Sequence, residues 1–277
     1  MTAAENPAAP QLVRDERGLA LVGGGMAVRA DFAALLPRVR QGRLSQELLV
    51  RAARVRGAAA PRALDATAGL GEDAFLLAAA GFDVELYERD ATIAALLRDG
   101  LARAAASEDP QLVVIVSRMH LHEEDSVAAL RALAAAGAAA GDGAAVGDGS
   151  AAGAAGDGSA AGAGLGGSGL GGGTGRAPGV LEAGVPVPDV IYLDPMFPAR
   201  RKSAAVKKKL QLLQQLERPA TDEEAGELLR AALAAGPRKV VVKRPAKGPD
   251  LAGVKPSYRV TGKAVRFDVI APASVSS

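Results

Sequence analysis

Short apolar runs alternate with amphipathic stretches along most of the chain. Residues 189–194 and 239–243 are apolar at most positions, whereas the segments between such runs repeat apolar residues at helical spacing. Apolar strands that alternate with helices are typical of a parallel sheet covered on both faces. The pattern predicts a mostly parallel α/β sheet of seven strands, at residues 62–65, 83–88, 111–116, 189–194, 239–243, 258–260 and 265–270. The last two flank Thr261-Gly262-Lys263, which predicts a closing antiparallel hairpin.

Helices are predicted between these strands. One follows the glycine-containing turn after the first strand, and others are expected at residues 92–106, 126–136, 203–217 and 222–235. The first 60 residues are less regular, with a glycine triplet at 23–25 and a helix expected at 45–55. We therefore expect a small N-terminal subdomain or cap at residues 1–60 and a main domain at residues 61–277.

Residues 137–179 differ from the rest of the chain because they are almost entirely Gly, Ala, Ser and Asp. Such a composition buries too little apolar surface to offset the entropy of ordering it. We interpret the segment as a flexible insertion in the main domain, which a surface loop can tolerate because loop-closure entropy grows slowly with length.

Composition excludes several classes of site. The chain has no cysteine, which excludes a disulfide framework, a zinc–thiolate site and a cysteine nucleophile. Lys and Arg number 33 against 31 Asp and Glu, so a surface that binds nucleic acid has to be local. No apolar run reaches the length of a membrane span and the N-terminus lacks a signal pattern. These features predict a soluble cytoplasmic protein with no membrane partner.

The clearest ligand motif is LDATAGLGEDAF. Asp65 ends the first main strand, and Gly69 and Gly71 lie in the turn that opens the next helix, where glycine lets the backbone approach a ligand. The spacing matches neither the dinucleotide fingerprint nor a phosphate-binding P-loop. Glu72 and Asp73 begin the helix, and their carboxylates would repel a pyrophosphate.

Glu88 ends the next strand, seventeen residues after Gly71. An acid at this position can accept hydrogen bonds from ribose hydroxyls. Alone, each feature also fits an ordinary strand–helix turn or an exposed acid. Together they favour an S-adenosylmethionine (SAM) site, in which Glu88 holds the adenosine and Asp65 lies near the cationic amino-acid end.

The segment YLDPMFPARRKS carries the predicted chemistry. Asp194 ends a strand, Pro195 fixes the turn, and Phe197 follows. The order is similar to the Asp/Asn-Pro-Pro-Tyr/Phe motif of enzymes that methylate base amines. The carboxylate can accept hydrogens of a weakly nucleophilic amine and stabilise the developing positive charge, while the ring can stack on a flipped-out base. The alternative is a proline-rich strand exit with a core phenylalanine.

Six cations follow within ten residues and are predicted to bind RNA phosphates: Arg200, Arg201, Lys202, Lys207, Lys208 and Lys209. Lys243 and Arg244 are expected to extend this patch. A solvated helix face is the alternative. His120 and His122 could suggest a metal site, but we interpret them as part of a polar loop after the third strand.

The motifs DATAGLGEDAF, ELYERD, YLDPMFP, KSAAVKKKLQLLQQL, VVVKRP and GKAVRFDV together resemble the small-subunit ribosomal RNA methyltransferase J family. The resemblance covers about residues 21–270 without the insertion. It implies a Rossmann-like class I SAM-dependent methyltransferase fold. It also implies a bacterial cytoplasmic enzyme that methylates N2 of one guanine in 16S rRNA of the small ribosomal subunit, with SAM as donor, no metal and no obligate protein partner.

The resemblance also implies the donor contacts, which we map position by position. They fall on the pair after the second glycine, on the acid–arginine pair after the second strand, on the acid of DPMFP, and on a pair after the third strand. In this chain these residues are Glu72, Asp73, Glu88, Arg89, Asp194, Arg118 and Met119. The chain departs from the family at the last pair, where it reads VSRMH instead of small polar residues.

Three other functions are considered. A methyltransferase that acts on DNA adenine or on a protein glutamine would share the DPMFP motif. A nucleotide-binding oxidoreductase is disfavoured by the missing third glycine and by the acids after Gly71. A catalytically silent RNA-binding protein is disfavoured by the intact Asp194 and Glu88.

Overall fold

The main sheet has seven strands, as predicted. The computed structural model describes residues 9–40, 42–142, 187–195, 212, 216, 218 and 220–272. In the main sheet the strand order is β6-β5-β4-β7-β8-β10-β9. The strands from β6 to β8 are parallel, and β10 runs antiparallel to both of its neighbours. The strands of this sheet are β4 (Arg62–Asp65), β5 (Asp83–Tyr87), β6 (Met119–His122), β7 (Val190–Leu193), β8 (Lys239–Pro245), β9 (Tyr258–Thr261) and β10 (Val265–Ile270).

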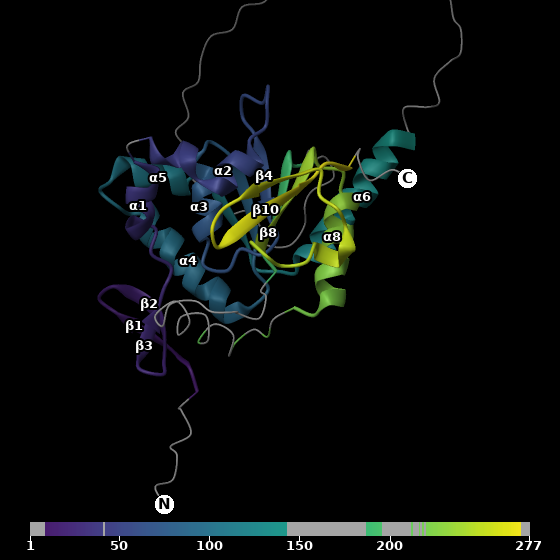
Figure 1. Ribbon diagram of the computed structural model, residues 1–277. Helices are drawn as coiled ribbons and strands as arrows, with labels where there is room; N and C mark the ends of the chain where they lie inside the picture. The colour runs from purple at the N-terminus through teal and green to yellow at the C-terminus, as the bar shows by residue number, and fades with distance from the viewer. Residues whose placement is uncertain are drawn as a thin grey trace, which may run out of the picture.

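Helices cover both faces of this sheet. Figure 1 shows α2, α3, α4 and α5 on one side of it and α6 and α8 on the other. The helices, including the short 3-10 turns η1 to η3, are η1 (Ala33–Leu35), α1 (Leu36–Val39), η2 (Arg43–Gln46), α2 (Leu48–Ala53), α3 (Glu72–Ala79), α4 (Ala91–Ala105), α5 (Pro110–Val116), α6 (Ser126–Asp142), α8 (Asp222–Ala234) and η3 (Leu251–Gly253). The α/β fold class with a mostly parallel seven-stranded sheet is thereby confirmed.

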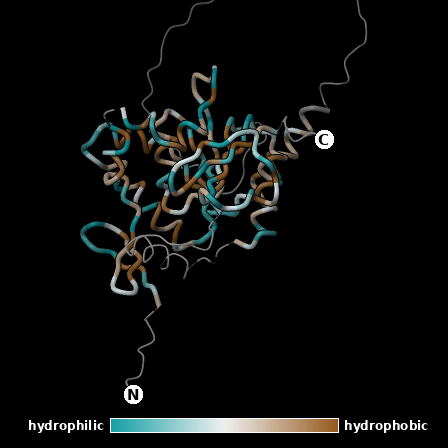
Figure 2. The backbone as a smooth tube through the Cα atoms, in the orientation of Figure 1, coloured by the Kyte–Doolittle hydropathy of each residue, from teal (hydrophilic) through white to brown (hydrophobic). Residues whose placement is uncertain are grey.

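Each face of the sheet has its own apolar core, because successive side chains of a strand point to opposite faces. Val190 and Val241 pack with α3 and α4, whereas Ile191 and Val240 pack with α6 and α8. Figure 2 shows the resulting arrangement, with apolar segments in the centre and hydrophilic loops outside.

The N-terminal region contains a small antiparallel sheet that the sequence pattern did not reveal. Its strands are β1 (Gln11–Asp15), β2 (Gly18–Gly23) and β3 (Met26–Val28). The glycine triplet forms the turn between β2 and β3, where Gly24 and Gly25 have positive φ. Leu21 and Val28 belong to the same apolar core as α3 and α4, so packing is continuous across residue 60. The division into two domains at this position stays a prediction.

The prediction of a strand at residues 111–116 is wrong. These residues form α5, and the strand lies later, as β6. The Asp109 carboxylate accepts hydrogen bonds from the backbone N–H groups of Gln111 and Leu112, and Pro110 occupies the first helical turn. An aspartate cap followed by proline is a strong helix start, and here it prevails over the β-branched composition of the run.

The boundaries around the insertion also change. Helix α6 continues to Asp142, so the first residues of the predicted insertion are helical, as their alanine content favours. The remainder of the insertion, apart from that helix end, lies outside the described residues, as does most of the predicted helix at 203–217. In the N-terminal region, the helix expected at 45–55 is divided between η2 and the shorter α2.

Candidate functional site

A cavity lies at the carboxyl ends of β4, β5, β6 and β7. Open parallel sheets bind ligands at this edge. Three of the predicted regions meet there: the glycine turn, the end of β5 and the start of the DPMFP motif. Its lining includes Ala66, Thr67, Gly69, Tyr87, Glu88, Arg89, Ile93, Glu124, Asp125, Ser126, Val127, Asp194, Pro195, Arg218, Ala220, Glu224, Ala225 and Leu228.

Glu88 connects the glycine turn to the end of β5. Its Oε2 accepts a hydrogen bond from the Gly69 backbone N–H at 2.9 Å, and its Oε1 accepts one from the Asp90 N–H at 2.9 Å. The residue is buried at 5% exposure but lines the cavity. Glu88 therefore shapes the cavity wall, and a carboxylate still has lone pairs for ligand hydroxyls.

The two glycines of the turn serve different purposes. At Gly69, φ is +55° and an added Cβ would meet nothing closer than 4.0 Å, so the position is open and borders the cavity. At Gly71, φ is +76° and a Cβ would lie 2.8 Å from Leu97 and 3.1 Å from Phe32. Gly71 is thus required for core packing and a left-handed backbone, and only Gly69 fits the predicted close approach to a ligand.

A chain of polar groups runs from α3 to Asp194. The Asp73 Oδ2 accepts hydrogen bonds from the Tyr192 hydroxyl and the Lys243 Nζ, both at 2.6 Å, and the same Nζ lies 2.9 Å from the Asp194 Oδ2. Thr67 Oγ1 also accepts the Asp194 backbone N–H at 2.7 Å. The carboxylate of Asp194 is therefore held from β8, and its backbone from the turn after β4.

Burial and neighbouring charges act together on the titratable groups of this chain of contacts. Burial alone would lower the pKa of Lys243, but the carboxylates of Asp194 and Asp73 outweigh it and raise the pKa above its ordinary value. Lys243 is therefore a permanent cation between two carboxylates. The same burial, reinforced by the neighbouring carboxylates, raises the pKa of Tyr192, so its hydroxyl stays protonated and acts as a donor to Asp73.

Asp65 lies behind the cavity and does not line it. The residue is 1% exposed, and its Oδ1 accepts the Thr67 N–H at 3.0 Å. Burial raises the pKa of this carboxyl from 3.8 to about 8, and the nearby carboxylates of Asp73 and Asp194 contribute to the rise. A neutral, buried acid is poorly suited to attract the cationic end of the donor, which was its predicted role. Glu72 lies exposed in the first turn of α3 and does not line the cavity.

The prediction that Lys243 and Arg244 extend an RNA-binding patch is wrong. Lys243 is bound by two carboxylates, and Arg244 is 4% exposed, with its Nε donating to the Pro249 carbonyl at 3.0 Å. Neither side chain is available to an RNA phosphate.

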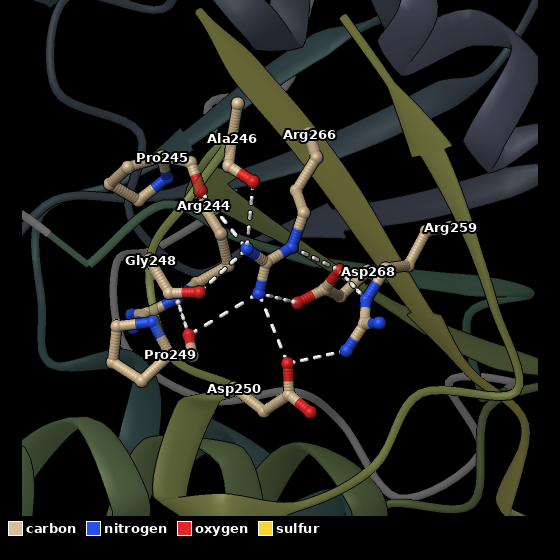
Figure 3. Close-up of polar contacts among 9 residues, drawn as sticks. All are labelled: Arg244, Pro245, Ala246, Gly248, Pro249, Asp250, Arg259, Arg266 and Asp268. Carbon is tan, nitrogen blue, oxygen red and sulfur yellow. Dashed lines mark hydrogen bonds and ion pairs between the residues drawn. The ribbon is translucent and has the colours of Figure 1, made fainter.

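Figure 3 shows the environment of Arg244. The nearby Arg266 guanidinium, 5% exposed, pairs with Asp268 and donates to the carbonyl oxygens of Pro245, Ala246, Gly248 and Pro249. These bonds anchor the loop after β8 to β10. The loop leaves the sheet at the same edge as Asp194, because β7 and β8 are parallel.

The mapping of donor contacts to Arg118 and Met119 is wrong as well. Met119 begins β6 at its amino end, and Arg118 donates to the Ala78 carbonyl at 3.2 Å, away from the cavity. The segment that follows β6 lines the cavity instead, with Asp125 and the buried Ser126 at the start of α6. These two residues do not follow from a third strand at 111–116, since such a strand would end before them. The helix-start signal at Asp109-Pro110 is the local signal that points to the later strand, β6.

The two histidines lie on β6 rather than in the loop after it. His120 Nε2 is 2.7 Å from the Asp83 Oδ1, and His122 Nε2 is 2.6 Å from the Glu85 Oε2, across the β5–β6 pair. His122 also stacks on Tyr87, with ring centroids 4.6 Å apart. Both histidines are thus cross-strand partners of acids. Within the described residues, no group of three or more potential metal ligands is present.

Seven predicted site residues lie outside the described residues: Phe197, Arg200, Arg201, Lys202, Lys207, Lys208 and Lys209. In the part of the chain that the structure describes, no helix combines the length and the apolar character that a membrane crossing requires.

Known proteins are similar to this chain in sequence and in fold. The family described as "Putative SAM-dependent methyltransferase" matches residues 4–139 and 175–272. The ribosomal RNA small subunit methyltransferase J of Cellvibrio japonicus is 38% identical over 267 residues, which cover 93% of this chain and 81% of that protein. Its counterpart from Thioalkalivibrio sulfidiphilus is 37% identical, covering 93% and 83% of the two chains.

A solved structure agrees. The crystal structure of a SAM-dependent methyltransferase from Neisseria gonorrhoeae matches with a TM-score of 0.63 and 26% identity, over 99% of this chain and 88% of that one. Sequence, fold and the cavity at the carboxyl edge of the sheet lead to one assignment. This chain belongs to the SAM-dependent methyltransferases and, among them, to the family of ribosomal RNA small subunit methyltransferases J.

Proposed function

We propose that this protein transfers a methyl group from SAM to the exocyclic N2 amine of a guanine in 16S rRNA of the small ribosomal subunit. The relatives are named as small-subunit rRNA methyltransferases, and the site supplies what an amine acceptor needs. The observation that carries the proposal is Asp194, whose partly exposed carboxylate lines the cavity at the end of β7. A cytoplasmic location, where the small subunit is made, is part of the proposal.

The cavity residues fit the donor. Glu88 and Gly69 would hold the ribose, and Asp125 and Ser126, beyond β6, would border the adenine. Asp194 is the carboxylate at the rim to which we assign the cationic amino-acid end, in place of the buried Asp65. When bound, SAM supplies an electrophilic methyl group on a positively charged sulfur.

The chain's own residues then act on the acceptor. A guanine amine is a weak nucleophile because its lone pair is delocalised into the ring. The Asp194 carboxylate accepts a hydrogen bond from the amine, aims its nitrogen at the methyl group and stabilises the positive charge that develops on nitrogen as the nitrogen–carbon bond forms and the sulfur–carbon bond breaks. The sulfur leaves as a neutral thioether, and the methylated nitrogen loses one proton to solvent. Lys243 fixes this carboxylate through Oδ2, so Lys243 is a positioning residue. We also propose that Phe197 stacks on the base and that Pro195 fixes the turn.

The net charge of Asp73, Asp194 and Lys243 favours the positive charge that develops on the acceptor amine. Asp73 and Asp194 together carry two negative charges against the single positive charge of Lys243, so the site is net negative where a cation develops. The alternative functions, methylation of DNA adenine or of a protein glutamine, would use the same carboxylate. They are separated by the acceptor rather than by the donor site.

The test is methyl transfer from labelled SAM to three acceptors: 16S rRNA that lacks the modification, DNA, and a protein carrying an accessible glutamine. We expect label in the RNA alone, in N2-methylguanosine after nucleoside analysis. The Asp194→Ala variant serves as the matched control for contaminating activity. Label in DNA or protein, or at another atom of the RNA, would contradict the proposal.

A further inference from the structure

A second hollow lies at the opposite, amino-terminal edge of the sheet. It is bordered by the end of α2, the start of β8 and the start of β9, and its lining is Arg51, Arg54, Val55, Arg56, Arg238, Lys239 and Tyr258. Five cationic side chains thus surround one exposed aromatic ring, since Tyr258 is 46% exposed. We call this set of residues the basic hollow.

Three of the four arginines in the basic hollow have no carboxylate partner within the described residues. Arg238 pairs with Asp189 at 3.1 Å. No carboxylate of the described residues lies within ion-pair distance of Arg51, Arg54 or Arg56. The chain as a whole carries a formal net charge of +2, so this gathering of charge is local.

Lys239 gives the hollow a fixed frame. Its Nζ donates to the carbonyl oxygens of Arg54 at 2.9 Å and Ala52 at 3.4 Å, and to the Tyr258 hydroxyl at 3.1 Å. It therefore ties the end of α2 to the first residue of β9. The tyrosine ring is held by its hydroxyl, while Arg51, Arg54 and Arg56 have no side-chain ion pair within the described residues.

We propose that the basic hollow binds a strand of the RNA substrate away from the target nucleotide, with arginines on phosphates and Tyr258 stacked on a base. Basic grooves with an exposed aromatic are how proteins hold single-stranded nucleic acid. An acidic protein segment would use the arginines but not the ring, which is why RNA is favoured. The proposal rests on the proposed rRNA substrate.

The position of the hollow gives it a separate role from the catalytic cavity. Lys239 and Lys243 stand four residues apart on β8, or about 13 Å at the rise of a strand. Side chains at the hollow therefore cannot touch the amine beside Asp194. Their effect should fall on RNA affinity and leave donor binding and the chemical step unchanged.

The test compares two triple variants of the full-length protein. In the first, Arg51, Arg54 and Arg56 become Gln. In the matched control, three exposed arginines elsewhere become Gln, namely Arg17, Arg131 and Arg230. Affinity for unmodified 16S rRNA is measured at several salt concentrations, and SAM affinity is measured by calorimetry as a check on the fold.

The expected result follows from counterion release, in which each phosphate contact on a single strand contributes about 0.7 to the slope of log affinity against log salt. Removing three contacts should flatten the slope by about 2 and weaken RNA binding about tenfold or more, with SAM affinity unchanged. If the slope and affinity match those of the control triple, the hollow is a solvated face and the proposal is overturned.

Tyr258 provides a second, independent readout. Tyr258→Ala should weaken RNA binding about 5- to 150-fold, the range of base–aromatic stacking, and should leave binding of the polyanion heparin unchanged. Tyr258→Phe keeps the ring and should stay close to wild type. Equal losses for RNA and heparin would mean that the hollow binds any polyanion, which contradicts the stacking role. Because these are binding measurements, they separate a failure here from a failure of methyl transfer.

Discussion

Strand β8 has a lysine near each edge of the sheet, and the two ammonium groups lie in opposite surroundings. At the carboxyl edge, Lys243 lies between the carboxylates of Asp73 and Asp194. At the amino edge, Lys239 binds two backbone carbonyls and a tyrosine hydroxyl, and its charged neighbours in the hollow are arginines.

This difference separates the ligands that each edge can take. A lysine between two carboxylates is a counter-ion that fixes them, and the remaining negative charge favours cationic groups. A lysine held by neutral acceptors among arginines adds to a field that favours polyanions. We therefore assign the proposed chemistry to one edge of the sheet and the proposed RNA docking to the other, and the following predictions test this division.

The largest effect is expected from Asp194→Ala. Loss of the aimed carboxylate should reduce the methyl-transfer rate by about 100-fold or more, as removal of one preorganised electrostatic group does elsewhere. Asp194→Asn should be milder, since its carbonyl still accepts a hydrogen bond. Single-turnover rates measure both, with circular dichroism to check folding. A variant that is less stable but turns over normally in its folded fraction would show that Asp194 only fixes the turn.

Lys243→Met should lower the rate by about 10- to 100-fold, in keeping with about 1.4–3 kcal/mol for a charge-assisted hydrogen bond. Lys243→Arg should restore part of the rate, because its guanidinium can still pair with both carboxylates. If Lys243→Met instead reduced RNA affinity at an unchanged rate, Lys243 would belong with the RNA-docking residues and the division would fail.

Glu88→Gln should weaken donor binding about tenfold, because an amide replaces one of two charge-assisted acceptors at the cavity wall. RNA affinity should not change, since Glu88 belongs to the wall that we assign to the donor ribose. Calorimetry with SAM and a parallel RNA titration measure the two affinities. Unchanged donor affinity in a folded variant would limit Glu88 to its bonds with Gly69 and Asp90.

The last prediction concerns Asp65, and its effect is on stability rather than on activity. Its pKa rises from 3.8 to about 8 on folding, so the folded chain binds more protons between these values. The free energy of unfolding should therefore fall as pH increases from about 4 to 8. Asp65→Asn removes this contribution, so the variant should gain stability relative to wild type across that range in urea titrations. Parallel pH dependences would show that Asp65 stays ionised.

Much of the fold was predictable because its signals are local. Six of the seven main strands match the predicted runs, and the glycine turn and the DPMFP segment lead to one cavity, as the edge rule for parallel sheets requires. The strand predicted at residues 111–116 is a helix instead, because the aspartate–proline helix start prevails over the β-branched composition of the run. As a result, the third strand was expected too early in the sequence, and Asp125 and Ser126 were not predicted to line the cavity.

Charged side chains were less predictable because their partners are distant in sequence. The sequence pattern predicts Lys243 and Arg244 to be basic surface residues, yet Lys243 pairs with Asp73, which lies 170 residues earlier in the sequence. Gly71 was predicted to let the backbone approach a ligand, but the space of its missing Cβ is filled by Phe32 and Leu97. Conversely, Arg51, Arg54 and Tyr258 carry no motif, and only the fold brings them together at one hollow.

The division between the two edges is tested most directly by single-turnover methyl transfer measured as a function of RNA concentration at saturating SAM. For Asp194→Asn we expect the plateau rate to fall while the half-saturating RNA concentration stays at the wild-type value. For the triple Gln variant of Arg51, Arg54 and Arg56, we expect the half-saturating concentration to rise while the plateau stays. If both variants change the same parameter, chemistry and RNA docking are not separated in this molecule.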